Sequence, residues 1–159
     1  MALLRILSGG QTGVDRAALD AALALGLPCG GWCPRGRRAE DGRIPARYPL
    51  TETPERDYRF RTEANVRAAD ATLILAEGPL TGGTALTLRL ARRAGRPVRV
   101  VDLARAPDPA ALAPWLRARG VRVLNVAGPR ESQRPGIGAR ARRWLEAALA
   151  PLAPGRVAQ

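Results

Sequence analysis

A glycine-rich turn near the N-terminus contains the residue types best suited to bind an anion. Gly9, Gly10, Gln11, Thr12 and Gly13 follow an apolar run that is typical of a buried strand and precede a helical pattern. Glycines let the backbone approach a ligand closely. A helix start adds unpaired N–H groups and a partial positive charge of about 0.5. This spacing therefore predicts a site for an anion, most often a phosphate, at the carboxyl edge of a parallel sheet.

Two further turns have similar chemistry. The segments Thr81-Gly82-Gly83-Thr84 and Gly128-Pro129-Arg130-Glu131-Ser132 also lie between a predicted strand and a predicted helix. Their hydroxyls can cap a helix or donate to phosphate oxygens, and the Arg130 guanidinium can bind a phosphate through two hydrogen bonds. Because such turns share one edge of a parallel sheet, we expect all three to form one anion site. Neither the G-x-G-x-x-G pattern nor the P-loop pattern is present.

Asp15 lies in the first turn of the first predicted helix. Its carboxylate can form a capping box with Thr12 and offset the helix dipole, or it can bind a ligand hydroxyl or the edge of a base. We also expect Gly10→Val to abolish ligand binding in a protein that still folds, because a side chain there would block the approach of the ligand.

Candidates for acid–base chemistry are found among the other carboxylates. Since solvated or Arg-paired carboxylates are common on protein surfaces, each also has a purely structural interpretation. The candidates are Glu40, Asp41, Glu52 and Glu63, of which Glu63 and Glu40 are proposed as possible catalytic residues.

Trp32 precedes a basic segment that contains Arg35, Arg37 and Arg38. Together they could form a lid in which an aromatic ring stacks on a planar ligand and arginines neutralise its phosphate. A solvated basic loop is the alternative interpretation. The binding site predicted from the sequence therefore also includes Trp32 and Arg35.

The composition excludes several mechanisms. All 26 basic residues are arginine, and the chain has no lysine and no histidine. Schiff-base chemistry, a P-loop lysine, Ser-His-Asp catalysis and imidazole metal ligands are therefore ruled out. The net charge of +12 could attract anions or reflect a GC-rich genome that favours arginine codons. Scattered arginines and few aromatic residues disfavour nucleic acid as a partner.

The two cysteines, Cys29 and Cys33, are too few to hold a metal in a chain without histidine, so we expect no metal site. A redox pair is conceivable, but C-x-x-x-C differs from the usual C-x-x-C spacing, and two ordinary thiols in a reducing cytosol are the preferred interpretation. No signal peptide or long apolar run is evident. A soluble, cytoplasmic protein is expected.

Apolar runs alternate with helical patterns along the chain. Continuous apolar strands indicate burial on both faces, hence an α/β fold: a Rossmann-like three-layer sandwich with a mostly parallel central sheet. A polar segment, 33–60, interrupts the alternation. We expect a single domain over 1–152 and a flexible tail over 153–159. Strands are predicted at 3–7, 27–32, 71–76, 98–102 and 121–126, and helices at 14–25, 61–69, 84–94, from 109, and at 137–150.

These motifs together resemble the putative molybdenum cofactor carrier family, a circularly permuted branch of the SLOG, lysine-decarboxylase-like Rossmann superfamily. The resemblance implies a Rossmann-like sheet, a homo-oligomer (dimer or tetramer), and a ligand cleft formed by the turns. The implied ligand is a molybdenum cofactor (molybdopterin), which combines a pterin ring with a phosphate, or a nucleotide. The matching segments are 8–17, 31–42, 61–66, 82–84 and 124–132.

Some relatives in that superfamily are phosphoribohydrolases that release a base from a nucleoside monophosphate. Their loop, Gly-Gly-x-Gly-Thr-x-x-Glu, ends in a catalytic glutamate. Thr87 stands at that position here, and a threonine cannot act as the required carboxylate. The sequence therefore favours a module that binds a phosphorylated planar ligand over a hydrolase of N-glycosidic bonds, which is the alternative; a nucleic-acid binder is a third, weaker hypothesis.

Overall fold

The computed structural model describes residues 3–155. Its centre is a five-stranded sheet in the order β2-β1-β9-β7-β8, in which every neighbouring pair is parallel. All six residues of β7 are buried, as the continuous apolar run predicts. The strands are β1 (Arg5–Leu7), β2 (Cys29–Gly30), β7 (Ala71–Ala76), β8 (Val98–Asp102) and β9 (Val123–Ala127).

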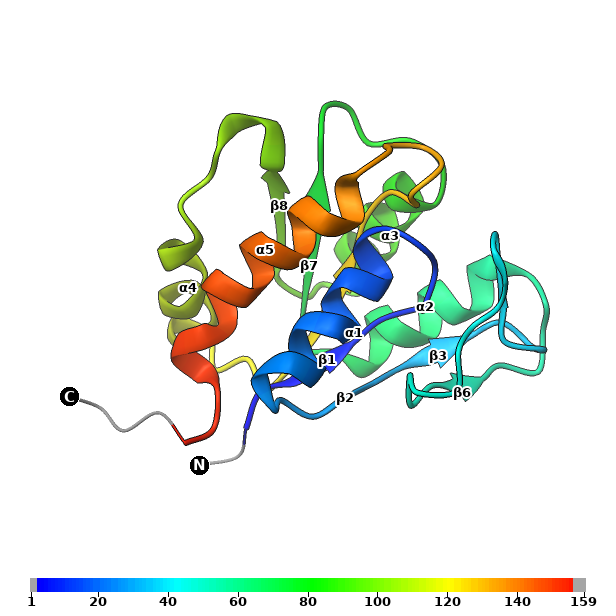
Figure 1. The fold of residues 1–159 in the computed structure, drawn as a ribbon, viewed down its shortest axis with the longest axis horizontal. Coiled ribbons are helices and arrows are strands. Elements are labelled where there is room, and N and C mark those ends of the chain that lie inside the picture. The colour runs from blue at the N-terminus through cyan, green and yellow to red at the C-terminus, as the bar shows by residue number, and fades with distance from the viewer. Residues whose placement is uncertain (1–2, 156–159) are drawn as a thin grey trace.

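Helices cover both faces of the sheet. α1 (Val14–Leu25) and α5 (Ile137–Leu149) pack together on one face, with α4 (Leu112–Ala118) beside α5, and α2 (Tyr58–Ala68) and α3 (Gly82–Arg93) pack together on the other (Figure 1). Small buried residues allow the close approach of α1 and α5: Ala17, Ala18, Ala21 and Ala22 on α1, and Ala141 and Ala148 on α5. The α/β, Rossmann-like three-layer prediction is confirmed.

Most predicted boundaries lie within three residues of the observed ones. α1 begins at Val14 as predicted, but its N-cap is Gly13, which has no side chain to form a capping hydrogen bond. The Thr12–Asp15 capping box is therefore wrong. α2 begins three residues earlier than predicted because the Asp57 side chain accepts a hydrogen bond from the Arg59 amide at 2.9 Å.

The predicted strand at 27–32 is two short strands, β2 and β3 (Trp32–Cys33), separated by Gly31. A Cβ at Gly31 would lie 2.3 Å from the Ser8 carbonyl oxygen. Beyond Gly31 the chain leaves the main sheet, and β3 pairs with β6 (Thr51–Glu52) instead.

One arginine connects several parts of the segment 33–60. The Arg37 guanidinium donates hydrogen bonds to four carbonyl oxygens, and β4 (Arg38–Ala39) pairs with β5 (Gly42–Arg43) beside it. Those carbonyls belong to Ile44, Pro45, Tyr48 and Leu50. Arg37 is therefore used to fold its own loop and is not available as a lid residue.

The C-terminal part of the described chain contains three short 3-10 helices, η1 (Leu103–Arg105), η2 (Pro109–Ala111) and η3 (Ala150–Leu152). Asp108 caps η2, with Pro109 at its first position. Of the predicted tail 153–159, residues 156–159 lie outside the described residues, and the single domain over 1–152 stays a prediction. Within 3–155, no helix combines the length and apolarity needed to span a bilayer.

Candidate functional site

Part of each glycine-containing turn reaches one cleft at the carboxyl edge of the sheet. The first turn contributes Gln11 and the start of α1 contributes Asp15. The start of α3 contributes Gly83 and Thr84, and the turn after β9 contributes Gly128 and Arg130. α2 forms the remaining wall through Tyr58, Arg59 and Arg61. The cleft is narrow, with a volume of about 60 Å³. The structure thus brings together segments that are far apart in the sequence.

Three arginines and a helix start make this cleft strongly cationic. Arg61 and Arg130 both lie near the Tyr58 ring, with guanidinium carbons 5.6 and 5.5 Å from its centroid. α3 begins at Gly82, and its N-cap residue Thr81 makes no side-chain capping hydrogen bond. The Thr84 and Ala85 amides donate to the Thr81 carbonyl, both at 3.2 Å, whereas the Gly82 and Gly83 N–H groups are left for water or a ligand. The helix start also adds the positive end of its dipole to the cleft.

Asp15 supplies the carboxylate in this cationic wall. It is only 3% exposed. Its Oδ2 accepts a hydrogen bond from the Gln11 amide at 3.2 Å and lies 3.4 Å from Arg61 Nη1. Burial raises the pKa of Asp15 above its ordinary value, although Arg61 and the Gln11 amide act in the opposite direction. Asp15 is therefore a carboxyl group in the wall of the cleft with a raised pKa.

Glu40 joins the first turn to the third turn from outside the cleft. It accepts hydrogen bonds from Thr12 Oγ1, from the Ser132 amide at 3.2 Å and from Ser132 Oγ at 2.5 Å. Desolvation raises the pKa of Glu40, but the hydrogen bonds from Ser132 and Thr12 and the charge of Arg130 outweigh it, so the pKa is lowered. Glu40 is an ionised clamp between loops rather than a proton donor.

The three glycines of the first turn serve the fold. At Gly10 (φ +77°), a Cβ would lie 2.5 Å from Leu50 Cδ1 and 2.9 Å from Ile44 Cδ1. At Gly13, it would lie 2.4 Å from the Pro129 carbonyl oxygen. A valine at Gly10 would press on Leu50 and Ile44 in a backbone conformation that favours glycine, so Gly10→Val should destabilise the fold as well as block the turn. Gly9 lines a small recess beside Asp15, where a Cβ would meet the Arg61 guanidinium.

Several predicted site residues lie away from the cleft. Trp32 lies along a separate groove with Glu63, which forms an ion pair with Arg67 at 2.8 Å. Arg35 is exposed, and its amide donates to the Glu55 carbonyl at 2.9 Å. The structure thus does not bring Trp32, Arg35 or Glu63 to the cationic cleft.

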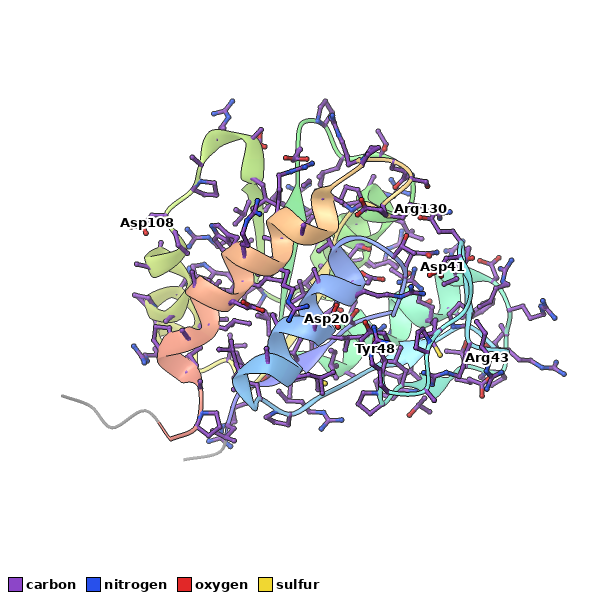
Figure 2. All side chains as sticks on the ribbon, viewed as in Figure 1. Asp20, Asp41, Arg43, Tyr48, Asp108 and Arg130 are labelled. Carbon is purple, nitrogen blue, oxygen red and sulfur yellow. The ribbon has the colours of Figure 1, made fainter. Side chains whose placement is uncertain are left out.

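Thr12 and Ser132 line a larger, open depression of about 950 Å³ between α1 and α5. Its walls carry four carboxylates, those of Asp20, Glu40, Asp41 and Glu131. Its arginines are paired, Arg16 with Asp41 and Arg142 with Glu146. Figure 2 labels Asp20 on α1, and Asp41 and Arg130 on loops. The depression suits an anion less well than the smaller cleft does.

Sequence reasoning missed the contribution of α2, namely Tyr58, Arg59 and Arg61. Asn65 anchors this helix: its side chain donates to the Trp32 carbonyl and accepts from the Trp32 amide, both at 2.9 Å. The Asp57 cap followed by Tyr-Arg-Phe-Arg was the available signal, since it places two arginines in a first helical turn. Within 3–155, no cluster of three metal-binding side chains is found, and Cys29 and Cys33 are buried free thiols.

A parallel sheet between two helical layers, with glycine turns at its carboxyl edge, defines a Rossmann-like domain. The chain belongs to the circularly permutated YpsA SLOG family, whose model matches residues 6–149. It is also similar to the crystal structure of a putative molybdenum carrier protein from Syntrophus aciditrophicus SB. The two share 45% identity and a TM-score of 0.89, over 94% of this chain and 96% of that one. Comparison with curated proteins finds no match.

Proposed function

We propose that the protein binds a phosphorylated planar small ligand, a molybdenum cofactor or a nucleotide, in the cationic cleft. The observation that carries this proposal is the meeting of Arg59, Arg61 and Arg130 with the uncapped start of α3. Helix starts and arginine forks are well matched to phosphate oxygens. Gly83 has no atom within 4 Å of the position that a Cβ would take, so a ligand can approach the backbone there.

The similarity to a protein named a molybdenum carrier supports the cofactor over other phosphorylated ligands. Under this proposal the protein holds the cofactor without converting it. We further propose that it works in the cytoplasm, as a homo-oligomer, without nucleic acid or membrane as a partner.

Hydrolysis of an N-glycosidic bond is the competing candidate. Thr87, at the position of the catalytic glutamate in related hydrolases, donates its hydroxyl hydrogen to the Gly83 carbonyl at 2.9 Å. Glu40 and Glu63 lie outside the cleft, whereas Asp15 lines it. Any base release by this protein would therefore depend on Asp15.

Thermal unfolding with nucleoside monophosphates and a phosphorylated pterin, together with chromatography for free base, tests the proposal. A ligand that binds only the folded state raises the melting temperature. We expect stabilisation without base release, reduced by Arg59→Gln or Arg130→Gln. Arg92→Gln is the matched control, because it removes the same charge from the far end of α3. Base release abolished by Asp15→Asn would establish the hydrolase instead, and no stabilisation by any of these ligands would refute the binding proposal.

A further inference from the structure

In the side-chain amide of Gln11, the oxygen is hydrogen-bonded and the nitrogen is not. Its Oε1 accepts hydrogen bonds from the Thr12 amide at 3.1 Å and the Glu40 amide at 2.9 Å. A flipped amide would place its NH₂ group against these two N–H donors, so the orientation is determined by the backbone. Nε2 is therefore turned away from these two amides.

Gln11 Nε2 is buried and makes no hydrogen bond within residues 3–155. The residue is 5% exposed and lines the cationic cleft. Leaving a buried donor unpaired is energetically costly, so such groups are rare in folded proteins. Arg61 Nε, in the same wall, is also buried and unpaired. Each donor can therefore pair with an acceptor that a ligand brings to the cleft.

Asp15 presents the complementary chemistry next to Gln11. Its Oδ2 is engaged by the Gln11 backbone amide and by Arg61. Among the hydrogen bonds of the described residues, none uses Oδ1. One short segment thus offers a donor, Nε2, and an acceptor, Oδ1. A phosphate could use the donor, but it would be repelled by the carboxylate.

We propose that Gln11 and Asp15 form a ring-edge subsite, which binds a heterocycle that carries an N–H donor next to a hydrogen-bond acceptor. Nε2 of Gln11 donates to the carbonyl oxygen or ring nitrogen of the ligand, and Oδ1 of Asp15 accepts from its N–H. This inference rests on the proposed function, since the arginines and the start of α3 hold the phosphate of the same ligand.

The subsite distinguishes ligands by their edge and not by their charge. Lactam edges, in which a ring N–H adjoins a carbonyl, fit both groups, and pterins, guanine and hypoxanthine share this edge. A sugar phosphate lacks the edge altogether. A ring is larger than the present cleft, so binding requires a rotamer change at its mouth. Arg130 can make this change, because its side chain is 34% exposed and is held only by a long ion pair, in which its Nε lies 4.0 Å from Glu40 Oε2.

Calorimetric titration of the full chain with three phosphorylated ligands tests this inference. Ribose 5-phosphate probes the anion site alone. Purine riboside 5′-phosphate adds a ring that has no N–H donor on its six-membered edge, and inosine 5′-phosphate adds the lactam edge to the same ring. We expect inosine phosphate to bind at least about tenfold more tightly than purine riboside phosphate, as one well-formed hydrogen-bond pair provides.

Two variants locate this preference. Gln11→Glu retains an oxygen that accepts from Thr12 and Glu40 but loses the donor, so the advantage of inosine phosphate should disappear. Gln133→Glu is its matched control, because it adds the same charge at the cleft rim, where Gln133 Oε1 only accepts from the Arg130 amide. Asp15→Asn turns the acceptor into a donor and should reverse the preference toward purine riboside phosphate, a gain that misfolding cannot produce.

The outcomes separate the two proposals. If ribose 5-phosphate and inosine phosphate bind equally well to the native protein, the ring-edge subsite is refuted and the anion site stands. If Gln133→Glu removes the inosine preference as fully as Gln11→Glu does, the effect is one of charge and the subsite is likewise refuted. If neither inorganic phosphate nor any of the three ligands binds, the proposed function itself fails.

Discussion

Asp15 combines burial, a raised pKa and a position in the cleft wall. An ionised carboxylate in such a place opposes an anion, and a protonated one does not. The charge of the Asp15 side chain is thus the chemical variable to which ligand binding at this cleft should be most sensitive.

Asp15→Asn should change how stability depends on pH. Because the folded-state pKa is raised, Asp15 contributes stability below its ordinary pKa, and this contribution is lost as pH rises through the folded-state pKa. The native protein should therefore lose stability relative to the variant as pH rises above about 4, the ordinary pKa of an aspartate, as measured by urea unfolding. Asp41→Asn should show the opposite trend, because the Arg16 hydrogen bond lowers the pKa of Asp41. Parallel trends for the two variants would contradict these assignments.

Gly13→Ala should destabilise the protein by about 2–4 kcal/mol, because the residue has a positive φ and its Cβ would press against the Pro129 carbonyl. Gly36→Ala is the control, since Gly36 has a similar φ but open space around it. Its cost should be about 1–2 kcal/mol, from backbone strain alone. Equal losses in chemical denaturation would mean that the turn can move away from Pro129.

The two loops that flank the cleft are held together by a carboxylate from a third segment. Glu40 belongs to the turn between β4 and β5, and it reaches both the start of α1 and the turn after β9. Residues that sequence reasoning assigned to the ligand, Thr12 and Ser132, are engaged by this clamp. The architecture of the cleft therefore depends on the segment 33–60. Within this segment, only Tyr58 and Arg59, which belong to α2, line the cleft.

Glu40→Gln should lower stability by about 1 kcal/mol near neutral pH, since it removes the charge from three hydrogen bonds at a partly solvated site. Because the pKa of Glu40 is lowered in the folded protein, this contribution is present above the ordinary pKa and is lost as pH falls through the folded-state pKa. Denaturation at several pH values measures both effects. Glu63→Gln, which breaks only the helix-surface pair with Arg67, should cost less than about 0.5 kcal/mol; an equal cost would argue against the clamp.

The net charge of +12 is distributed over the entire chain, yet the cleft described here gathers only three arginines. Other arginines are used inside the fold, as Arg37 is for its four carbonyls and Arg140 for Glu77. Some of the arginines therefore have structural roles within the fold, and the expectation that nucleic acid is not the target stays a prediction.

The predicted homo-oligomer can be tested by light scattering coupled to size-exclusion chromatography. One chain has a mass of 16.9 kDa, and we expect a particle of two or four chains at neutral pH. Repeating the measurement at high salt serves as the control, because charge repulsion between highly basic chains weakens as salt is added. A mass of a single chain under both conditions would contradict the prediction.

Local patterns in the sequence were sufficient to determine the α/β class, the parallel strands and most helix boundaries. Hydrophobic periodicity and burial on both faces are properties of neighbouring residues, and so are caps such as Asp108 and stops such as Gly26. Even the three glycine turns could be placed on one edge of the sheet, because parallel topology requires it.

Only the tertiary structure decided which side chains face the cleft. Arg61 and Tyr58 come from α2, which lies on the face of the sheet opposite α1. Thr12 and Ser132 instead donate hydrogen bonds to Glu40 outside the cleft. The free end of Gln11 was likewise hidden, since its direction depends on amides from two separate segments. Side-chain direction results from contacts between residues distant in the sequence, and no local pattern encodes it.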